Sequence, residues 1–98
     1  MQVLNLRWNA YRTPSQLADV VAALAAEFGL TVGPVSELKS IPGSQHWHLK
    51  KDGHRGVLEV TLAARDQTGN VSVHDNRVGS WTPEALTAFR DRLQALLA

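Results

Sequence analysis

The chain has 98 residues, with ten basic and nine acidic side chains and a formal net charge of +1. This length suits one domain, residues 1–98, and the balanced charge gives no general attraction to nucleic acid or to an anionic membrane surface. The absence of cysteine excludes disulfide bonds, thiolate chemistry and cysteine-ligated zinc. The chain has no apolar run of membrane-spanning length and no signal-peptide pattern at its start, so we expect a cytoplasmic protein without a membrane partner.

The N-terminal segments predict an edge strand and then a helix. Residues 1–8 carry apolar side chains at positions that suit an edge strand or an extended arm. Thr13-Pro14-Ser15-Gln16 combines a capping threonine, a proline suited to the first helical position and the glutamine of a capping box. Apolar residues then recur with helical spacing from Leu17 to Phe28, and Gly29 is placed to end the helix.

The segment after this helix predicts two strands of unequal regularity. Residues 30–41 suggest an irregular strand, interrupted at Gly33-Pro34 because proline fits an edge or a bulge but not a central strand. Residues 45–51, QHWHLKK, follow the strand period. Trp47 and Leu49 should point to the buried face, and the polar side chains between them to the other face.

Residues 56–81 predict an antiparallel hairpin around which the other elements are arranged. Residues 57–63 form the first limb and residues 71–78 the second, joined by a polar loop that contains Gly69. Asp52-Gly53 is a tight-turn signal, so the first limb should also pair with the preceding strand.

A second helix is predicted from Thr82-Pro83-Glu84 to the C-terminus. Threonine is the expected cap, proline takes the first helical position, and glutamate lies where the helix dipole favours an anion. Each helix has one apolar stripe, and together they need one apolar sheet face to cover. We therefore predict an α+β two-layer sandwich, with an antiparallel sheet of three to five strands and the N-terminal and C-terminal helices on one face. The expected core is Leu24, Phe28, Val60, Leu62, Val73, Phe89 and Leu93.

The sheet face away from the helices should be uncovered, and the polar chemistry of the chain gathers there. The alternating period of the strands, extended to the residues that follow them, places a set of candidate binding residues on this face. They are His46, His48, Lys50, Glu59, Ser72, His74 and Asn76, and Thr61 shares the face with them. Arg77, in the polar segment after the last strand, is added as a further candidate binding residue.

A metal site is one interpretation of this face. His46 and His48 lie two residues apart on one strand, and His74 and Glu59 could join them from neighbouring strands. Imidazole and carboxylate groups suit zinc or another transition metal. The alternative is a sheet face whose polar side chains simply meet water. Without a family-specific spacing motif the sequence favours that alternative, and no cofactor is predicted.

Nucleic acid binding and catalysis have weaker support. The balanced charge argues against nucleic acid, and Trp47 alternates with the histidines, so it is not available to stack bases on the polar face. There is no cysteine nucleophile, no G-x-S-x-G elbow and no glycine-rich phosphate loop. Ser72 and His74 share a face, but that spacing alone does not define an active site. The chain is therefore not expected to be an enzyme.

An interaction module is the leading prediction, reached by elimination. An uncovered sheet face invites a partner, either a second copy in a two-fold homodimer or another protein. The outer helix surface around Ala22, Ala23 and Ala26 could also let a second helix approach, although alanine's helix propensity is the simpler explanation. Trp8 and Trp81 could anchor an interface, and the alternative is that both pack in the core or over its edge. The alternative function is a His-rich metal-binding or small hydrolytic site on the same sheet face.

Three strings carry a resemblance to other proteins. HWHLKK (46–51), G-x-LEVT (56–61) and HDNR-x-GSW (74–81) are similar to strings in small bacterial single-domain proteins of uncharacterised activity. The resemblance covers about residues 45–82 and implies no catalytic role for any of them. The helix–sheet–helix order is also similar to that of frataxin-like domains, although the first helix here has only two acidic residues, Asp19 and Glu27, in place of their acidic helix.

Overall fold

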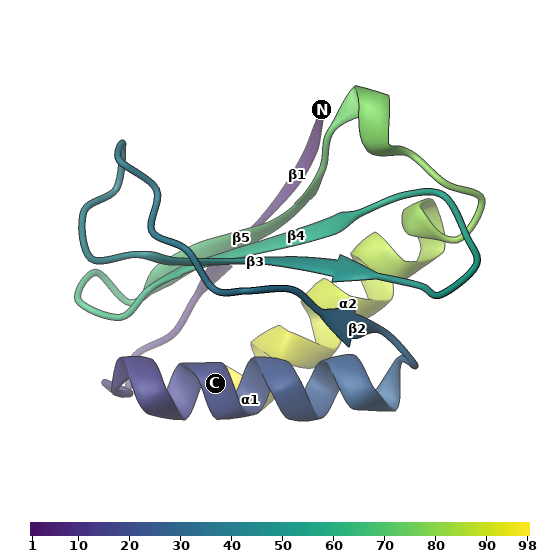
Figure 1. The fold of residues 1–98 in the computed structure, drawn as a ribbon. Coiled ribbons are helices and arrows are strands. Elements are labelled where there is room, and N and C mark those ends of the chain that lie inside the picture. The colour runs from purple at the N-terminus through teal and green to yellow at the C-terminus, as the bar shows by residue number, and fades with distance from the viewer.

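The computed structural model describes all residues from 1 to 98 as a five-stranded sheet with two α-helices beneath it (Figure 1). In chain order the elements are β1 (Gln2–Arg7), α1 (Pro14–Glu27), β2 (Thr31–Val32), β3 (Gln45–Lys50), β4 (Leu58–Ala63), β5 (Thr68–Val73), the 3₁₀ helix η1 (Asp75–Arg77) and α2 (Thr82–Leu97). The strand order is β1-β5-β4-β3-β2, and every neighbouring pair is antiparallel. The predicted α+β sandwich is confirmed. Neither helix combines the length and the apolar character needed to cross a membrane.

Helix α1 begins as its sequence predicts. The Thr13 hydroxyl accepts a hydrogen bond from the Gln16 backbone N–H at 3.1 Å, and the Gln16 side chain accepts one from the Thr13 N–H at 2.9 Å. These reciprocal bonds satisfy backbone donors that the first helical turn leaves free. The helix is followed by Gly29, whose φ of +67° is a conformation that glycine adopts without strain.

Helix α2 begins one residue differently from the prediction. Thr82 is its first residue and is not the cap; Trp81 precedes it without a capping side-chain bond. The Thr82 hydroxyl instead accepts a hydrogen bond from the Gly79 N–H at 3.0 Å and donates one to the Gly79 carbonyl at 2.9 Å. The threonine therefore fixes the turn before the helix by bonding to a residue three positions earlier, instead of capping the helix.

Strand β5 is shifted relative to the predicted second limb of the hairpin. It begins at Thr68, inside the expected loop, and ends at Val73, after which residues 75–77 form η1. At the end of η1 the Arg77 carbonyl accepts a hydrogen bond from the N–H of Val57, just before β4, at 2.9 Å. Gly69 allows the shifted pairing, since a Cβ at this position would lie 2.3 Å from the Thr61 carbonyl oxygen.

The irregular strand predicted over residues 30–41 is reduced to the two residues of β2 and one isolated bridge between Ser36 and His46. Pro34 has no backbone N–H to continue the ladder. Residues 33–44 instead form a long connection that rises over the polar face at one end of the sheet (Figure 1). Strands β3 and β4 pair as predicted, but residues 51–57 join them in place of a tight Asp52-Gly53 turn.

The hydrophobic core lies between the sheet and the two helices. The predicted core residues are buried except for Phe28, which is half-buried at the end of α1 and packs against the core. Trp47 and Trp8 are both 3% exposed. The prediction for Trp47 is confirmed, whereas Trp8 belongs to the core and cannot be the interface anchor that the sequence suggested.

The outer edge of β1 is covered by side chains from α2. The Gln94 side chain accepts a hydrogen bond from the Arg7 backbone N–H at 3.2 Å and donates one to the Arg7 carbonyl at 2.7 Å. Arg90 Nε donates to the Asn5 carbonyl at 3.0 Å. The backbone groups that an edge strand normally leaves open are therefore occupied at these two residues.

Candidate metal centre

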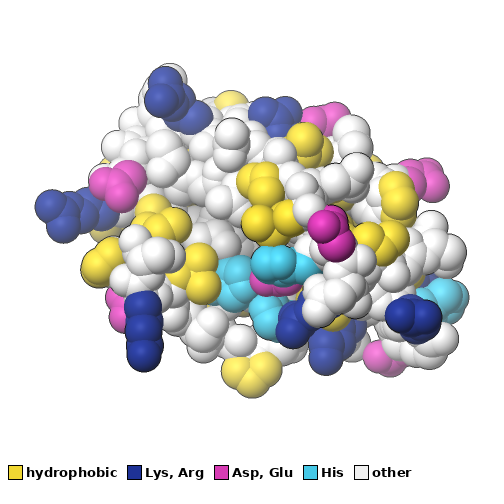
Figure 2. Space-filling view, turned by 90° about the horizontal axis from the view of Figure 1, so that it is seen from above, with side chains coloured by type: hydrophobic (Ala, Val, Ile, Leu, Met, Phe, Trp, Pro, Cys, Tyr) yellow, Lys and Arg dark blue, Asp and Glu magenta, His cyan; other side chains and the backbone are white.

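The register of β3 and β4 brings the main polar residues together. His46 lies opposite Thr61, and His48 lies opposite Glu59, so all four side chains share the face away from the helices. His74 joins them directly after the end of β5. Figure 2 shows the histidine side chains gathered around a carboxylate in the middle of this face.

Three donor atoms converge in this cluster. His46 Nε2 lies 2.9 Å from Glu59 Oε1, and His48 Nε2 lies 3.3 Å from the same oxygen. The two Nε2 atoms are 3.2 Å apart. His74 Nε2 approaches the other carboxylate oxygen, Oε2, at 3.2 Å. The carboxylate is therefore surrounded by three imidazoles, and two of them meet at one of its oxygens.

The residues at the centre of the polar face are buried, so the prediction that the whole face is exposed is wrong. Glu59 is 3% exposed, Thr61 4% and Ser72 6%, because all three lie on the inner strands β4 and β5 between neighbouring side chains. The His46 side chain is 11% exposed, but those of His48 and His74 are 38% and 46% exposed. The cluster thus runs from a buried carboxylate to imidazoles that reach solvent, which leaves a path for an ion to enter.

The charge of Glu59 is poorly compensated. Its Oε2 atom is buried and has no hydrogen bond, and the permanently charged Arg77 guanidinium is 4.0 Å away. Burial lowers the pKa of His48 below its ordinary value of 6.5; the Glu59 carboxylate opposes this shift, while His46 and Arg77 add to it. His48 is therefore neutral at neutral pH, which is the form of imidazole that binds metals.

Hydrogen bonds behind the cluster orient its imidazoles. His46 Nδ1 lies 2.7 Å from the Thr61 hydroxyl, an outer contact of the kind that fixes a metal-binding imidazole. His48 Nδ1 lies 3.4 Å from Arg77 Nη1. A guanidinium can only donate, so this nitrogen of His48 must accept, and the ring proton belongs on Nε2. Thr61 was expected on this face but not in the site, because its role depends on the β3–β4 register.

The remaining predicted site residues have different positions. Asn76 and Arg77 are in η1, not in a strand, and they line a cavity of about 220 Å³ with His48, Glu59 and His74. Ser72 lies opposite Glu59 but makes no side-chain hydrogen bond within the protein. Lys50 is exposed at the end of β3 and does not line this cavity. The structure therefore groups the histidines, Glu59, Asn76 and Arg77, and leaves Lys50 apart.

Comparisons with known proteins give no match, whether against protein-family models, curated proteins or solved structures. The similarity to bacterial single-domain proteins and to frataxin-like domains stays a prediction. The function has to be argued from the geometry and chemistry of the cluster itself.

Proposed function

We propose that the protein binds a divalent transition-metal ion of the zinc class through His46 Nε2, His48 Nε2 and Glu59 Oε1. The observation that carries this proposal is the triangle of donor atoms, whose sides are 2.9, 3.2 and 3.3 Å. Tetrahedral zinc sites with bonds of about 2.0–2.1 Å hold adjacent donors about 3.3 Å apart. The three atoms thus have the spacing of one face of a tetrahedral site.

Charge supports the same ligand set. A buried carboxylate oxygen without a hydrogen bond is unfavourable, and Glu59 Oε2 has only His74 Nε2 at 3.2 Å and Arg77 at 4.0 Å beside it. A divalent cation would compensate the carboxylate charge far better. Two imidazoles and one carboxylate are ligand types that suit zinc in proteins without cysteine. Three protein ligands leave a fourth position for water or another small molecule, so the ion would act as a Lewis acid there.

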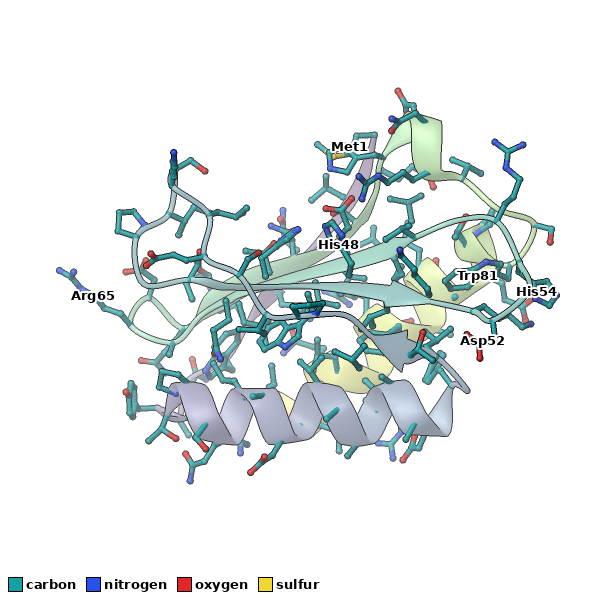
Figure 3. The ribbon with its side chains drawn as sticks, in the orientation of Figure 1. Met1, His48, Asp52, His54, Arg65 and Trp81 are labelled. Carbon is teal, nitrogen blue, oxygen red and sulfur yellow. The ribbon has the colours of Figure 1, made fainter.

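Zinc titration by calorimetry tests the proposal. We expect one zinc ion per chain in the parent protein. His46→Ala and Glu59→Gln each remove a donor atom, so each should weaken binding by more than the about 10–100-fold typical of changes to outer contacts. His54→Ala is the matched control, because His54 is exposed in the β3–β4 connection, away from the cluster, and its Nδ1 contacts the Asp52 carbonyl (Figure 3).

Two results would contradict the metal site. The parent protein could bind no zinc, in which case the cluster would be held by shared protons alone. Alternatively, His54→Ala could weaken binding as much as His46→Ala, which would place the ion elsewhere. Circular dichroism of each variant establishes that lost binding does not reflect lost folding.

A second candidate function is self-association through the polar face, as predicted from the sequence. One observation favours it: an exposed apolar side chain lies in the same row as the cluster. Val3 is opposite Ser72, which is opposite Glu59, and Val3 is 42% exposed. Met1, which precedes β1, is 61% exposed. Light scattering tests this candidate, since a two-fold dimer should have twice the chain mass.

A further inference from the structure

A polar cavity lies beside the proposed metal ligands. It has a volume of about 220 Å³ and is lined only by polar side chains. His48, Glu59 and His74 come from the sheet or its end, and Asn76 and Arg77 come from η1. A small polar molecule in this space would touch the open side of the metal centre and the side chains of η1 at the same time.

The two η1 side chains have unused hydrogen-bond donors. The Asn76 side chain makes no hydrogen bond within the protein and is exposed. Arg77 has five N–H donors, yet its guanidinium makes one long contact, to His48 Nδ1 at 3.4 Å, and lies 4.0 Å from Glu59 Oε2. Its side chain is 42% exposed. The side chain of Arg77 is therefore held by two weak contacts, both to proposed metal ligands.

Metal binding would remove both contacts. A neutral His48 that binds a metal through Nε2 must carry its proton on Nδ1, the atom that Arg77 contacts. Two donors would then face each other, and the contact would be lost. The metal would also neutralise the carboxylate of Glu59, which is the other group near the guanidinium. Arg77 would be left beside the cavity as a cation without an acceptor.

We infer that the metal-loaded protein binds a small oxyanion, a carboxylate or a tetrahedral sulfate- or phosphate-type group, in this cavity between the metal and Arg77. The inference rests on the proposed metal site and adds its ligand class. The planar guanidinium offers paired donors that match such anions, and the Asn76 amide offers another donor. Without the metal, the carboxylate of Glu59, which lines the same space, repels an anion. Metal and oxyanion therefore strengthen each other's binding, since linkage is reciprocal.

The test is a zinc titration in sodium chloride, sodium acetate and sodium sulfate at matched pH and ionic strength. Acetate represents a carboxylate and sulfate a tetrahedral anion, so the two arms distinguish the sources of the oxyanion. In the parent protein, at least one of them should lower the zinc Kd relative to chloride by about fivefold or more. Arg77→Ala should still bind zinc in chloride but lose this enhancement.

Arg65→Ala is the matched control for charge. Arg65 is exposed in the β4–β5 turn, at the opposite end of the sheet from His54 (Figure 3). Its removal changes the net charge as Arg77→Ala does and should leave the anion effect intact. Arg77→Gln provides the same test if the alanine variant does not fold.

Three outcomes would overturn the oxyanion site. Neither anion could change the zinc affinity of the parent, Arg77→Ala could keep the full enhancement, or Arg65→Ala could lose it as well. Each of these leaves the metal site standing, because zinc binding in chloride is measured separately. Absence of zinc binding in chloride would instead reject the proposed metal site, and the oxyanion site with it.

Discussion

The ring of Phe28, just after α1, meets the ring of Phe89 in α2 edge to face, with centroids 5.1 Å apart and an interplanar angle of 65°. This contact joins the two helices over the core. Phe89 has no exposed surface. Phe89→Ala should therefore lower the free energy of unfolding by about 3–5 kcal/mol, since it removes a buried ring and leaves a cavity.

Urea unfolding measures this loss. Leu96→Ala in the same helix is the control, because Leu96 is 36% exposed and its truncation should cost much less. A loss below about 1 kcal/mol for Phe89→Ala, the size of an ordinary point-mutant effect, would show that the ring does not support the core as described.

Gly69 should be far less tolerant of alanine than Gly33. A Cβ on Gly69 would lie 2.3 Å from the Thr61 carbonyl oxygen and 2.7 Å from Leu62 Cδ2, whereas on Gly33 its nearest neighbour would be 3.4 Å away. Gly69→Ala should destabilise the protein by about 1–3 kcal/mol through overpacking. Gly33→Ala should stay within about 0.5 kcal/mol. Thermal unfolding of both variants checks the difference, and equal melting temperatures would contradict the tight β4–β5 approach.

His48 should make the metal-free protein less stable at acidic pH. Its pKa in the folded state lies below 6.5, mainly because of burial. As the pH falls below about 6.5, His48 takes up a proton in unfolded chains before it does so in folded ones. The stability that neutral His48 contributes is therefore lost progressively until the pH has passed below the pKa of the folded state. Above about pH 6.5 this contribution is fully present.

Urea titrations with a chelator present test this sign. Between about pH 7 and pH 5 the parent should lose more stability than His48→Gln, which cannot titrate at this position. His54→Gln should follow the parent, because that side chain lies outside the cluster. A steeper acid loss in His48→Gln than in the parent would give the opposite sign and refute the lowered pKa.

The predicted dimer should depend on Val3. If two polar faces associate, Val3→Lys places a charge in the contact and should convert a dimer into a monomer, as seen by multi-angle light scattering. Val32→Lys is the control, because Val32 is 40% exposed but belongs to β2 and faces the helix side of the sheet, opposite Leu49.

Ala22→Glu tests the alternative interface, the alanine surface of α1. If Ala22→Glu dissociates the dimer and Val3→Lys does not, the interface lies on α1. If the parent protein is a monomer at high micromolar concentration, the prediction of a dimer is wrong.

Local sequence signals predicted those parts of the fold whose causes are local. The Thr13–Gln16 capping box specifies the start of α1 through neighbouring backbone groups. The two-residue period of β3 separates Trp47 from His46 and His48 without knowledge of any partner strand. These assignments needed only helical and strand geometry, and the structure confirms them.

The remaining features depend on residues far apart in the sequence. The Val57 N–H donates to the Arg77 carbonyl across twenty positions, where Asn76 and Arg77 lie in η1 and not in the strand that local alternation predicted. The convergence on Glu59 needs the register between β3 and β4, which no local pattern specifies. The burial of Glu59 is likewise not specified by a local pattern, because it results from the position of β4 inside the sheet. The sequence therefore predicts most members of the site but not how they are arranged around the Glu59 carboxylate.

The paired hydrogen bonds between Gln94 and the backbone of Arg7 limit how this protein can polymerise. Amyloid-like growth and β-strand addition both require a free row of backbone groups at a sheet edge. At β1 a side chain already takes the place of the incoming strand, and the opposite edge offers only the two residues of β2. A continuous intermolecular sheet would therefore have to displace this side chain at one edge or grow from two residues at the other.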